Sequence, residues 1–151
     1  MCHYNNNNTA AVFIDEGYVA KLLRKHFGEP RIDYGAFASW CASGMTIFRT
    51  YYYDCLPHQS SEPSEEERER LSRAQRFFVA LQRLERFSVR QGRLVYRGVD
   101  DKGDPVYQQK RVDLQLGLDI ASVVSRGVVR MIVLVSGDSD LIPALQFAQQ
   151  E

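Results

Sequence analysis

Apolar residues fall into short runs along the chain, and three of these runs are typical of buried strands. Residues 11–14 (Ala-Val-Phe-Ile) form a run that ends at Asp15, residues 131–135 form a second, and residues 46–53 are rich in β-branched and aromatic side chains. Continuous apolar runs of this length are expected where both faces of a parallel sheet are covered. Residues 87–99 alternate between apolar and polar positions, which predicts one or two further strands.

Helical spacing fills the segments between these strands. Apolar side chains recur at the helical period over residues 18–27, 33–42, 111–125 and 141–150. The clearest start signal is Ser64 followed by Glu67, a capping box that predicts a helix to about residue 84. Strands that alternate with helices indicate an α/β fold with a mainly parallel sheet. We expect a flexible lead-in over residues 1–10 and one domain over residues 11–151, truncated before its last strand region because the chain stops directly after a helix.

Composition and charge narrow the class of protein. Hydrophobic residues make up 44% of the 151 residues, which is typical of a globular chain with a core. The 19 basic and 19 acidic residues cancel, so the chain is no histone-like polycation, although a local basic surface is compatible with this balance. The longest apolar run, residues 128–135, is broken by Arg130 and is far shorter than the roughly 20 residues of a membrane span.

Cellular location follows from two further features. No basic residue precedes the first apolar run, which argues against a secretory signal. The three cysteines, Cys2, Cys41 and Cys55, form no disulfide framework. We therefore expect a protein of the reducing cytoplasm, with no membrane partner.

Aspartates stand where function gathers in a parallel sheet, at the carboxyl ends of strands. Asp15 ends the first predicted strand, and Asp138 and Asp140 follow the last one directly. Each of them alone is also a good helix cap, and that simpler interpretation stays open. Asp113 lies in the first turn of a predicted helix, on the same stripe as apolar residues such as Leu116. A carboxylate on such a stripe is costly to desolvate unless something pairs with it.

Four converging carboxylates repel one another, so a protonated member or a divalent cation is needed to offset their charge. Oxygen ligands without paired histidines or cysteines favour Mg²⁺ or Mn²⁺ over Zn²⁺. Asp119 lies on the polar side of the same helix as Asp113, and we expect it to be a solvated residue or a partner of Lys110.

Three segments around these aspartates carry motifs that strengthen the prediction: Ala11-Val-Phe-Ile-Asp-Glu-Gly-Tyr, Gln109-Lys-Arg-Val-Asp-Leu-Gln-Leu-Gly-Leu-Asp and Val133-Leu-Val-Ser-Gly-Asp-Ser-Asp-Leu-Ile-Pro. In this order they resemble the NYN domain of the PIN-like nuclease family, and the bacterial LabA-like (DUF88) proteins in particular. The resemblance implies a three-layer PIN-like sandwich and a Mg²⁺- or Mn²⁺-dependent ribonuclease. In that family the matching aspartates are the catalytic and metal-binding residues, here Asp15, Asp113, Asp138 and Asp140.

Two positions depart from the pattern that many relatives share. Tyr18 stands where they carry an asparagine that helps to hold the site, and Glu16 replaces a glycine. Both departures favour a second hypothesis, a non-catalytic RNA-binding or regulatory NYN module. The residues leave the oligomeric state open, including a homo-oligomer.

Basic residues suggest where RNA binds. Between Arg68 and Arg97 there are nine arginines and two acids. Arginine binds phosphate well because its guanidinium group is a rigid fork of donors. The candidates for contacts with RNA are Arg73, Arg76 and Arg83 on the predicted helix, together with Lys110 and Arg111 beside Asp113. An ordinary solvated helix face explains the three arginines equally well.

Other chemistry is less well supported. Tyr51, Tyr52 and Tyr53 can stack unpaired bases, although we expect two of them to pack within a strand. Cys55 and His58 resemble half a zinc site without a second pair. No Gly-rich phosphate loop precedes a helix, which argues against nucleotide hydrolysis and dinucleotide binding.

Overall fold

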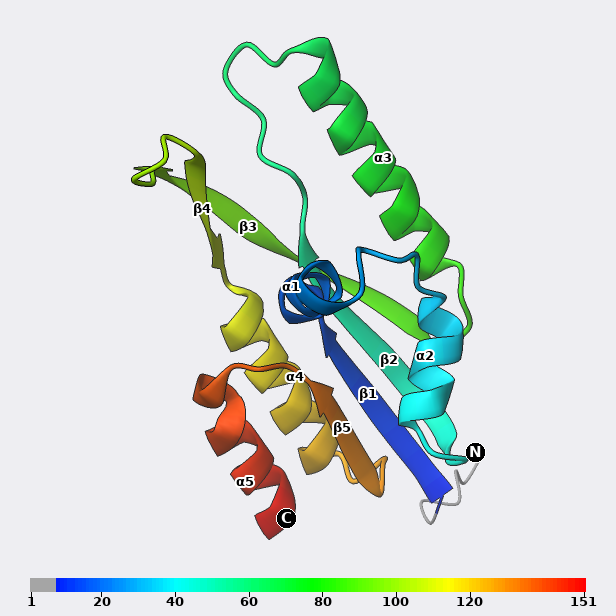
Figure 1. Cartoon of the computed structure of the whole chain (residues 1–151). Coiled ribbons are helices and arrows are strands. Elements are labelled where there is room, and N and C mark those ends of the chain that lie inside the picture. The colour runs from blue at the N-terminus through cyan, green and yellow to red at the C-terminus, as the bar shows by residue number, and fades with distance from the viewer. Residues whose placement is uncertain (1–7) are drawn as a thin grey trace.

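The protein folds around one mixed sheet of five strands, and the computed structural model describes residues 8–151 of the chain (Figure 1). The strands are β1 (Thr9–Asp15), β2 (Thr46–Cys55), β3 (Phe87–Val99), β4 (Pro105–Lys110) and β5 (Met131–Val135). Their order across the sheet is β4-β3-β2-β1-β5. Neighbours run parallel except for β3 and β4, which form an antiparallel hairpin. The predicted α/β fold with a mainly parallel sheet is confirmed.

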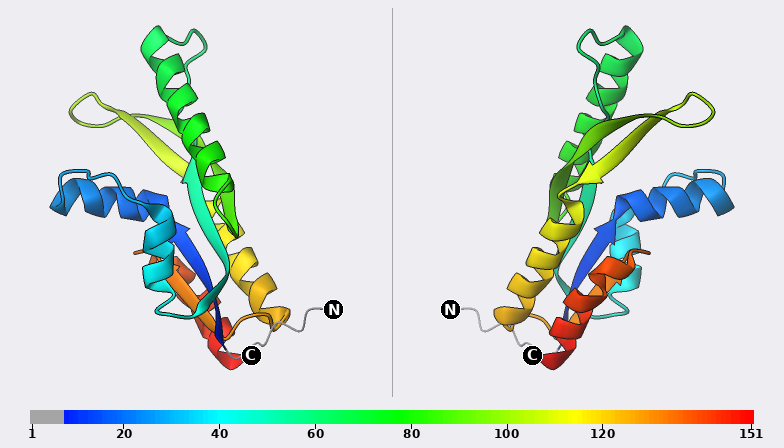
Figure 2. Two further views of the ribbon diagram at one scale, coloured as in Figure 1. Left: turned by 90° about the vertical axis from the view of Figure 1, so that its right-hand side faces the viewer. Right: turned by 90° about the vertical axis from the view of Figure 1, so that its left-hand side faces the viewer.

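Helices cover both faces of this sheet and so create three layers (Figure 2). They are α1 (Glu16–His26), α2 (Tyr34–Cys41), α3 (Glu65–Gln82), α4 (Val112–Ser125), a short 3₁₀ helix (Ser139–Leu141) and α5 (Ile142–Gln150). Buried residues of α1, α2 and α3 pack on one face, and those of α4 and the 3₁₀ helix pack on the other, with α5 beside them. The assignment to a PIN-like sandwich and the truncated C-terminus stay predictions.

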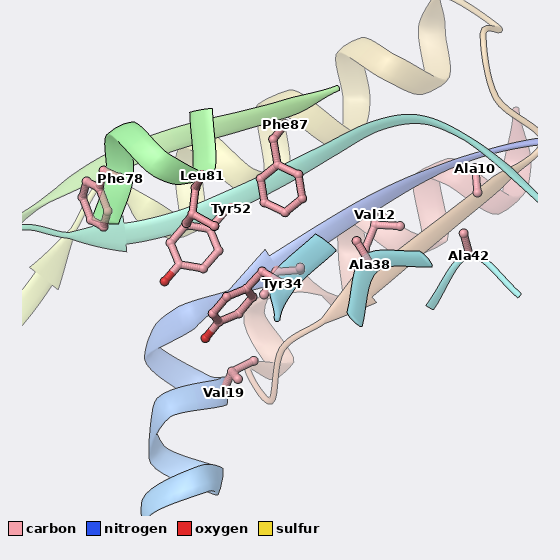
Figure 3. Close-up of a cluster of buried hydrophobic side chains, with 11 residues drawn as sticks. Ala10, Val12, Val19, Tyr34, Ala38, Ala42, Tyr52, Phe78, Leu81 and Phe87 are labelled. Atoms are coloured by element: carbon pink, nitrogen blue, oxygen red, sulfur yellow. The ribbon is translucent and has the colours of Figure 1, made fainter. Parts of the chain in front are cut away.

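The central strand β1 explains why the first apolar run is continuous. It lies between β2 and β5, and all seven of its residues are buried. Val12 and Ile14 point into the core below α1, α2 and α3, while Phe13 points into the opposite core. The first core also contains Tyr34, Tyr52 and other side chains (Figure 3).

The three consecutive tyrosines of β2 are packed inside the protein. Tyr52 lies in the first core, and Tyr51 and Tyr53 lie in the second. Their exposed fractions are 3%, 1% and 0% for Tyr51, Tyr52 and Tyr53, so all three pack within the protein, one more than the two we expected, and none is exposed for stacking on bases. Successive side chains of a strand point to opposite faces, and here both faces are covered.

Polar side chains mark the starts of helices as the sequence indicates. The Ser64 hydroxyl accepts a hydrogen bond from the Glu67 backbone and the Glu67 carboxylate accepts one from the Ser64 backbone, so the predicted capping box is confirmed. The Asp33 carboxylate caps α2 by accepting a hydrogen bond from the Ala36 backbone. α1 begins at Glu16, directly after β1, whereas its apolar spacing had placed the start at Tyr18.

Several boundaries differ from the predictions. β1 begins at Thr9, so Thr9 and Ala10 belong to the sheet and not to the expected lead-in; residues 1–7 of that lead-in lie outside the described residues. β2 continues through Asp54 to Cys55. β4 was not predicted, because its residues are mostly polar and exposed and show no apolar alternation. Within residues 8–151, no helix is both long and apolar enough to span a membrane.

Candidate acidic site

Asp15 is the most firmly held of the four candidate aspartates. It ends β1 and is 9% exposed. Its Oδ1 accepts a hydrogen bond from the Tyr18 backbone (3.4 Å), which makes it the N-cap of α1. Its Oδ2 accepts one from the Ser136 hydroxyl (2.9 Å). The capping interpretation is therefore correct for Asp15, and the cap fixes the carboxylate at the carboxyl edge of the sheet.

Asp138 and Asp140 come to the same edge through β5. β1 and β5 are parallel with Ile14 opposite Val135, so the next residues, Asp15 and Ser136, leave the sheet side by side. The Ser136 hydroxyl also accepts a hydrogen bond from the Asp138 backbone (3.2 Å). Asp138 Oδ1 accepts one from the Asp140 backbone (2.9 Å) and caps the 3₁₀ helix. Ser136 thus links the Asp15 carboxylate to the turn that carries Asp138 and Asp140.

Asp113 joins this edge from the first turn of α4. Although Asp113 is exposed, partial desolvation of its carboxyl group raises its pKa, and the charges of Asp138, Asp15 and Asp140 raise it further, in that order. Asp113 and Asp140 also line one shallow hollow between α4 and α5, together with Leu114, Gly117 and other residues. The other three aspartates are therefore near enough to Asp113 for their charges to act on it.

The prediction that Asp113 lies on the core-facing stripe of its helix is wrong, because Asp113 is exposed. The neighbouring Val112 takes the position against the sheet, where it contacts β3 so closely that a methyl group on Gly92 would lie 2.5 Å from Val112 Cγ2. Asp113, 100° further round the helix, faces outward at the rim of the sheet. Arg111, which precedes them, has a left-handed backbone (φ 74°) that turns the chain from β4 into α4.

The aromatic ring of Tyr18 lies against Gly137. A methyl group on Gly137 would lie 2.4 Å from Tyr18 Cε2 and 2.7 Å from Cδ2, so only glycine fits there without movement of the ring. Tyr18 therefore packs on the turn that carries Asp138 and Asp140.

The donor chemistry suits a hard divalent cation, since all four side chains offer carboxylate oxygens. Their placement is more open than a finished metal cage: within residues 8–151, no three His, Cys, Asp or Glu side chains are grouped closely enough to hold a metal ion. The proximity of the four charges is thus a feature of the structure, and metal binding by them remains a prediction.

A second pair of carboxyl groups lies beside Asp15, and sequence reasoning missed it. Glu16 accepts a hydrogen bond from the Tyr34 hydroxyl. Burial raises the pKa of Glu16 to about 7, with a further contribution from the charge of Asp54. Burial also raises the pKa of Asp54 to about 6. The sequence offered one indication of this pair: Glu16 directly follows the end of β1, and Asp54 lies near the end of β2.

Asp119 is not the solvated residue that we expected. Its carboxylate accepts two hydrogen bonds from the Arg90 guanidinium (3.0 and 3.3 Å) and one from the Tyr53 hydroxyl (2.8 Å). Asp119 therefore pairs with Arg90 of β3 and Tyr53 of β2, on the face of the sheet that α4 covers, and not with Lys110. Of the half zinc site, the buried Cys55 lies against Gly92, and the His58 ring packs on Tyr107.

The basic candidates divide into two groups. Lys110 ends β4 and Arg111 caps α4, so both precede Asp113 by two or three residues and are exposed at the site. Arg73, Arg76 and Arg83 are exposed on α3, which packs on the face of the sheet opposite α4 (Figure 1). The structure brings only the first group next to the acidic residues.

The fold and this edge define an α/β protein with aspartates gathered at the carboxyl ends of neighbouring parallel strands. The sequence profile of the NYN domain matches residues 9–151, and the chain belongs to the NYN domain family. No curated protein shows a significant match. A crystal structure of a protein of unknown function from Vibrio parahaemolyticus is similar, with a TM-score of 0.59 and 22% identity, over 97% of this chain and 77% of that chain. At this identity the similarity concerns the fold alone.

Proposed function

We propose that this NYN domain is a metal-dependent ribonuclease that hydrolyses RNA phosphodiester bonds at Asp15, Asp113, Asp138 and Asp140. The observation that carries the proposal is the gathering of the four aspartates at one edge of the sheet, where Ser136 links Asp15 to Asp138, Asp113 and Asp140 line one hollow, and partial desolvation and the charges of the other three raise the pKa of Asp113. Carboxylates that perturb one another in this way need added positive charge to stay ionised together. Mg²⁺ or Mn²⁺ is the proposed source of that charge.

Each acidic residue has a place in this proposal. Asp15 and Asp138 are held by hydrogen bonds and serve as the fixed ligands. Asp113 and Asp140 line the hollow between α4 and α5 and serve as ligands open to solvent and substrate. When bound, the cation would activate water and stabilise the charge that develops on a phosphate during in-line displacement.

Positively charged side chains are proposed to hold the RNA. Lys110 and Arg111 are exposed directly before Asp113, where phosphates beside the scissile bond would lie. Arg73, Arg76 and Arg83 of α3 would add affinity at a distance, through phosphates that take no part in the chemistry.

A non-catalytic RNA-binding module is the second candidate function. It is favoured by the open placement of the carboxylates, of which no three within residues 8–151 form a metal-holding group. The Tyr18 ring, packed where many relatives carry an asparagine, favours it as well.

Incubation of the purified protein with labelled single-stranded RNA in Mn²⁺, Mg²⁺ or EDTA tests the proposal. We expect metal-dependent cleavage that Asp138→Asn removes, since asparagine keeps the shape and the cap oxygen but loses the charge. The metal-free melting temperature of the variant should hold or rise because repulsion among the acids falls. Glu62→Gln, an amide replacement in an exposed loop, is the matched control and should cleave as the wild type does.

The two candidate functions give different results. Equal cleavage by the wild type and Asp138→Asn in Mn²⁺ would contradict the assignment of the site. Binding of RNA without any cleavage, in both proteins alike, would identify the chain as the non-catalytic module.

A further inference from the structure

The β3–β4 hairpin extends away from the helical layers of the protein (Figures 1 and 2). Its far half carries two aromatic residues that face each other across the strands, Tyr96 on β3 and Tyr107 on β4. Both are exposed, by 51% and 42%. The exposed faces of these rings gain nothing from burial within the fold and are open to a ligand.

The rings form a cluster with a third member from outside the hairpin. The centroids of Tyr96 and Tyr107 are 5.9 Å apart. His58, from the loop after β2, lies 5.2 Å from Tyr107 and 6.5 Å from Tyr96. The three planes are tilted by 34° to 60° relative to one another, so they do not close into one sealed stack. We refer to Tyr96, Tyr107 and His58 as the aromatic platform.

The aromatic platform is continuous with the acidic site. Gln109 lies two residues after Tyr107 on β4 and therefore on the same face of the strand, about 7 Å further along. The Gln109 side chain reaches Gly17, whose added methyl group would lie 3.0 Å from Gln109 Oε1 and 3.3 Å from Asp15 Oδ1. A chain that runs along this face from the aromatic platform arrives directly at Asp15.

The hairpin carries a small excess of positive charge. Its two strands carry the basic residues Arg90, Arg93, Arg97 and Lys110 and no acidic residue, whereas the turn between them carries Lys102 and the three acidic residues Asp100, Asp101 and Asp104. Arg90 is paired with Asp119 on α4. Arg93 faces Lys110 across the ladder, and Arg97 hydrogen-bonds only to the neutral Gln108 among the described residues. These three alternate with Tyr96 and Tyr107 along the strands and so point to the opposite face, where they add to the positive charge of the hairpin without lying on the face of the aromatic platform.

We infer that the aromatic platform is a stacking site for unpaired bases, which guides single-stranded nucleic acid along β4 into the acidic site. Exposed aromatic side chains recognise single strands without sequence preference, because each base has a stacking face, and the path from these rings to the acidic site makes a nucleic acid the fitting ligand. A duplex keeps its bases stacked inside and does not use such a surface. The inference rests on the proposed function for the identity of the ligand as RNA, and it names the substrate as single-stranded.

Binding in the absence of divalent metal separates this inference from catalysis. The probe is a short labelled oligoadenylate, compared in EDTA by fluorescence anisotropy with an abasic oligonucleotide of the same length and charge. We expect Tyr96→Ala/Tyr107→Ala to weaken oligoadenylate binding by at least about fivefold for each ring, and to leave abasic binding unchanged. Tyr96→Phe/Tyr107→Phe keeps both rings and should bind within about twofold of the wild type.

Two controls separate stacking from other effects. Trp40 is 78% exposed on α2, distant in sequence and fold from the hairpin, so Trp40→Ala removes an exposed aromatic without loss of binding. The dependence of affinity on salt should be equal in the wild type and the double alanine variant, because the phosphate contacts are kept.

Several results would overturn the inference. One is equal affinity of the wild type for oligoadenylate and its abasic counterpart. Another is an alanine variant that binds both probes as the wild type does, or that loses affinity for both alike. A change confined to the oligomeric state would instead make this face an interface between copies of the chain. Each outcome is read in EDTA, so absence of cleavage does not affect it.

Discussion

The contact between the Tyr18 ring and Gly137 makes Gly137→Ala an informative perturbation. The alanine Cβ would lie 2.4 Å and 2.7 Å from two carbons of the ring, far inside van der Waals contact. Gly137 is not among the glycines with a positive φ, so alanine meets no backbone penalty there. The cost comes from displacement of the ring alone, and overpacking of this kind typically costs about 1–3 kcal/mol.

A double-mutant cycle isolates this contact. In a Tyr18→Ala background the space is open, and Gly137→Ala should stabilise the fold by about 0.4–1 kcal/mol because it restricts the unfolded chain. The sign of the Gly137→Ala effect should therefore reverse, with a coupling of about 2 kcal/mol between the two sites. Urea unfolding of the four proteins, followed by far-UV circular dichroism, measures it. An equal cost of Gly137→Ala with and without Tyr18 would refute the packing of the ring on the turn.

The same four proteins report on the acidic site. A displaced turn moves Asp138 and Asp140 relative to Asp15, so Mn²⁺-dependent cleavage should fall in Gly137→Ala. It should recover in part when Tyr18→Ala removes the clash. Recovery of stability without recovery of cleavage would show that Tyr18 does more than hold the turn.

Three further predictions concern stability and binding. Burial raises the pKa of Asp54 from 3.8 to about 6, so the fold loses stability relative to the unfolded chain as pH rises through this range and gains it back as pH falls. Relative to the wild type, Asp54→Asn should therefore gain on the order of 2 kcal/mol in unfolding free energy between pH 4 and pH 8, and a pH-independent difference would contradict this. Asp119→Ala removes the common acceptor of Arg90 and Tyr53 and should lower the unfolding free energy by about 2 kcal/mol, against less than about 0.5 kcal/mol for a solvated residue. Alanine at Arg73, Arg76 and Arg83 should weaken RNA binding and flatten its salt dependence; an unchanged slope would return α3 to an ordinary solvated helix face.

The elements that could be predicted are those whose signal is local. β5 covers residues 131–135 as predicted, because its half-buried side chains pack alternately against both cores and therefore form a continuous apolar run. The Ser64 capping box marks the start of α3 since the two residues that satisfy each other are three positions apart. The same holds for Asp15 and Asp138, whose places at strand ends follow from the runs that precede them.

The features that could not be predicted depend on partners far along the chain. Asp119 bonds to Arg90, 29 residues away, and to Tyr53, 66 residues away. β4 exists because it pairs with β3, and its own sequence carries no apolar alternation. The exposure of Asp113 depends on where α4 crosses the rim of the sheet, which the contact of Val112 with Gly92 sets. Helical periodicity alone does not contain that information.

The bonding of the carboxylate oxygens reconciles the capping and ligand interpretations of the aspartates. Both oxygens of Asp15 and one of Asp138 accept hydrogen bonds from the protein, so these two groups are oriented before any cation arrives. Asp113 and Asp140 accept no hydrogen bond from residues 8–151 and lie exposed in the first turns of their helices. Two carboxylates that are held by hydrogen bonds, Asp15 and Asp138, thus lie near two that accept none, Asp113 and Asp140. This arrangement explains why the charges act on Asp113 although no metal-holding group is formed among residues 8–151.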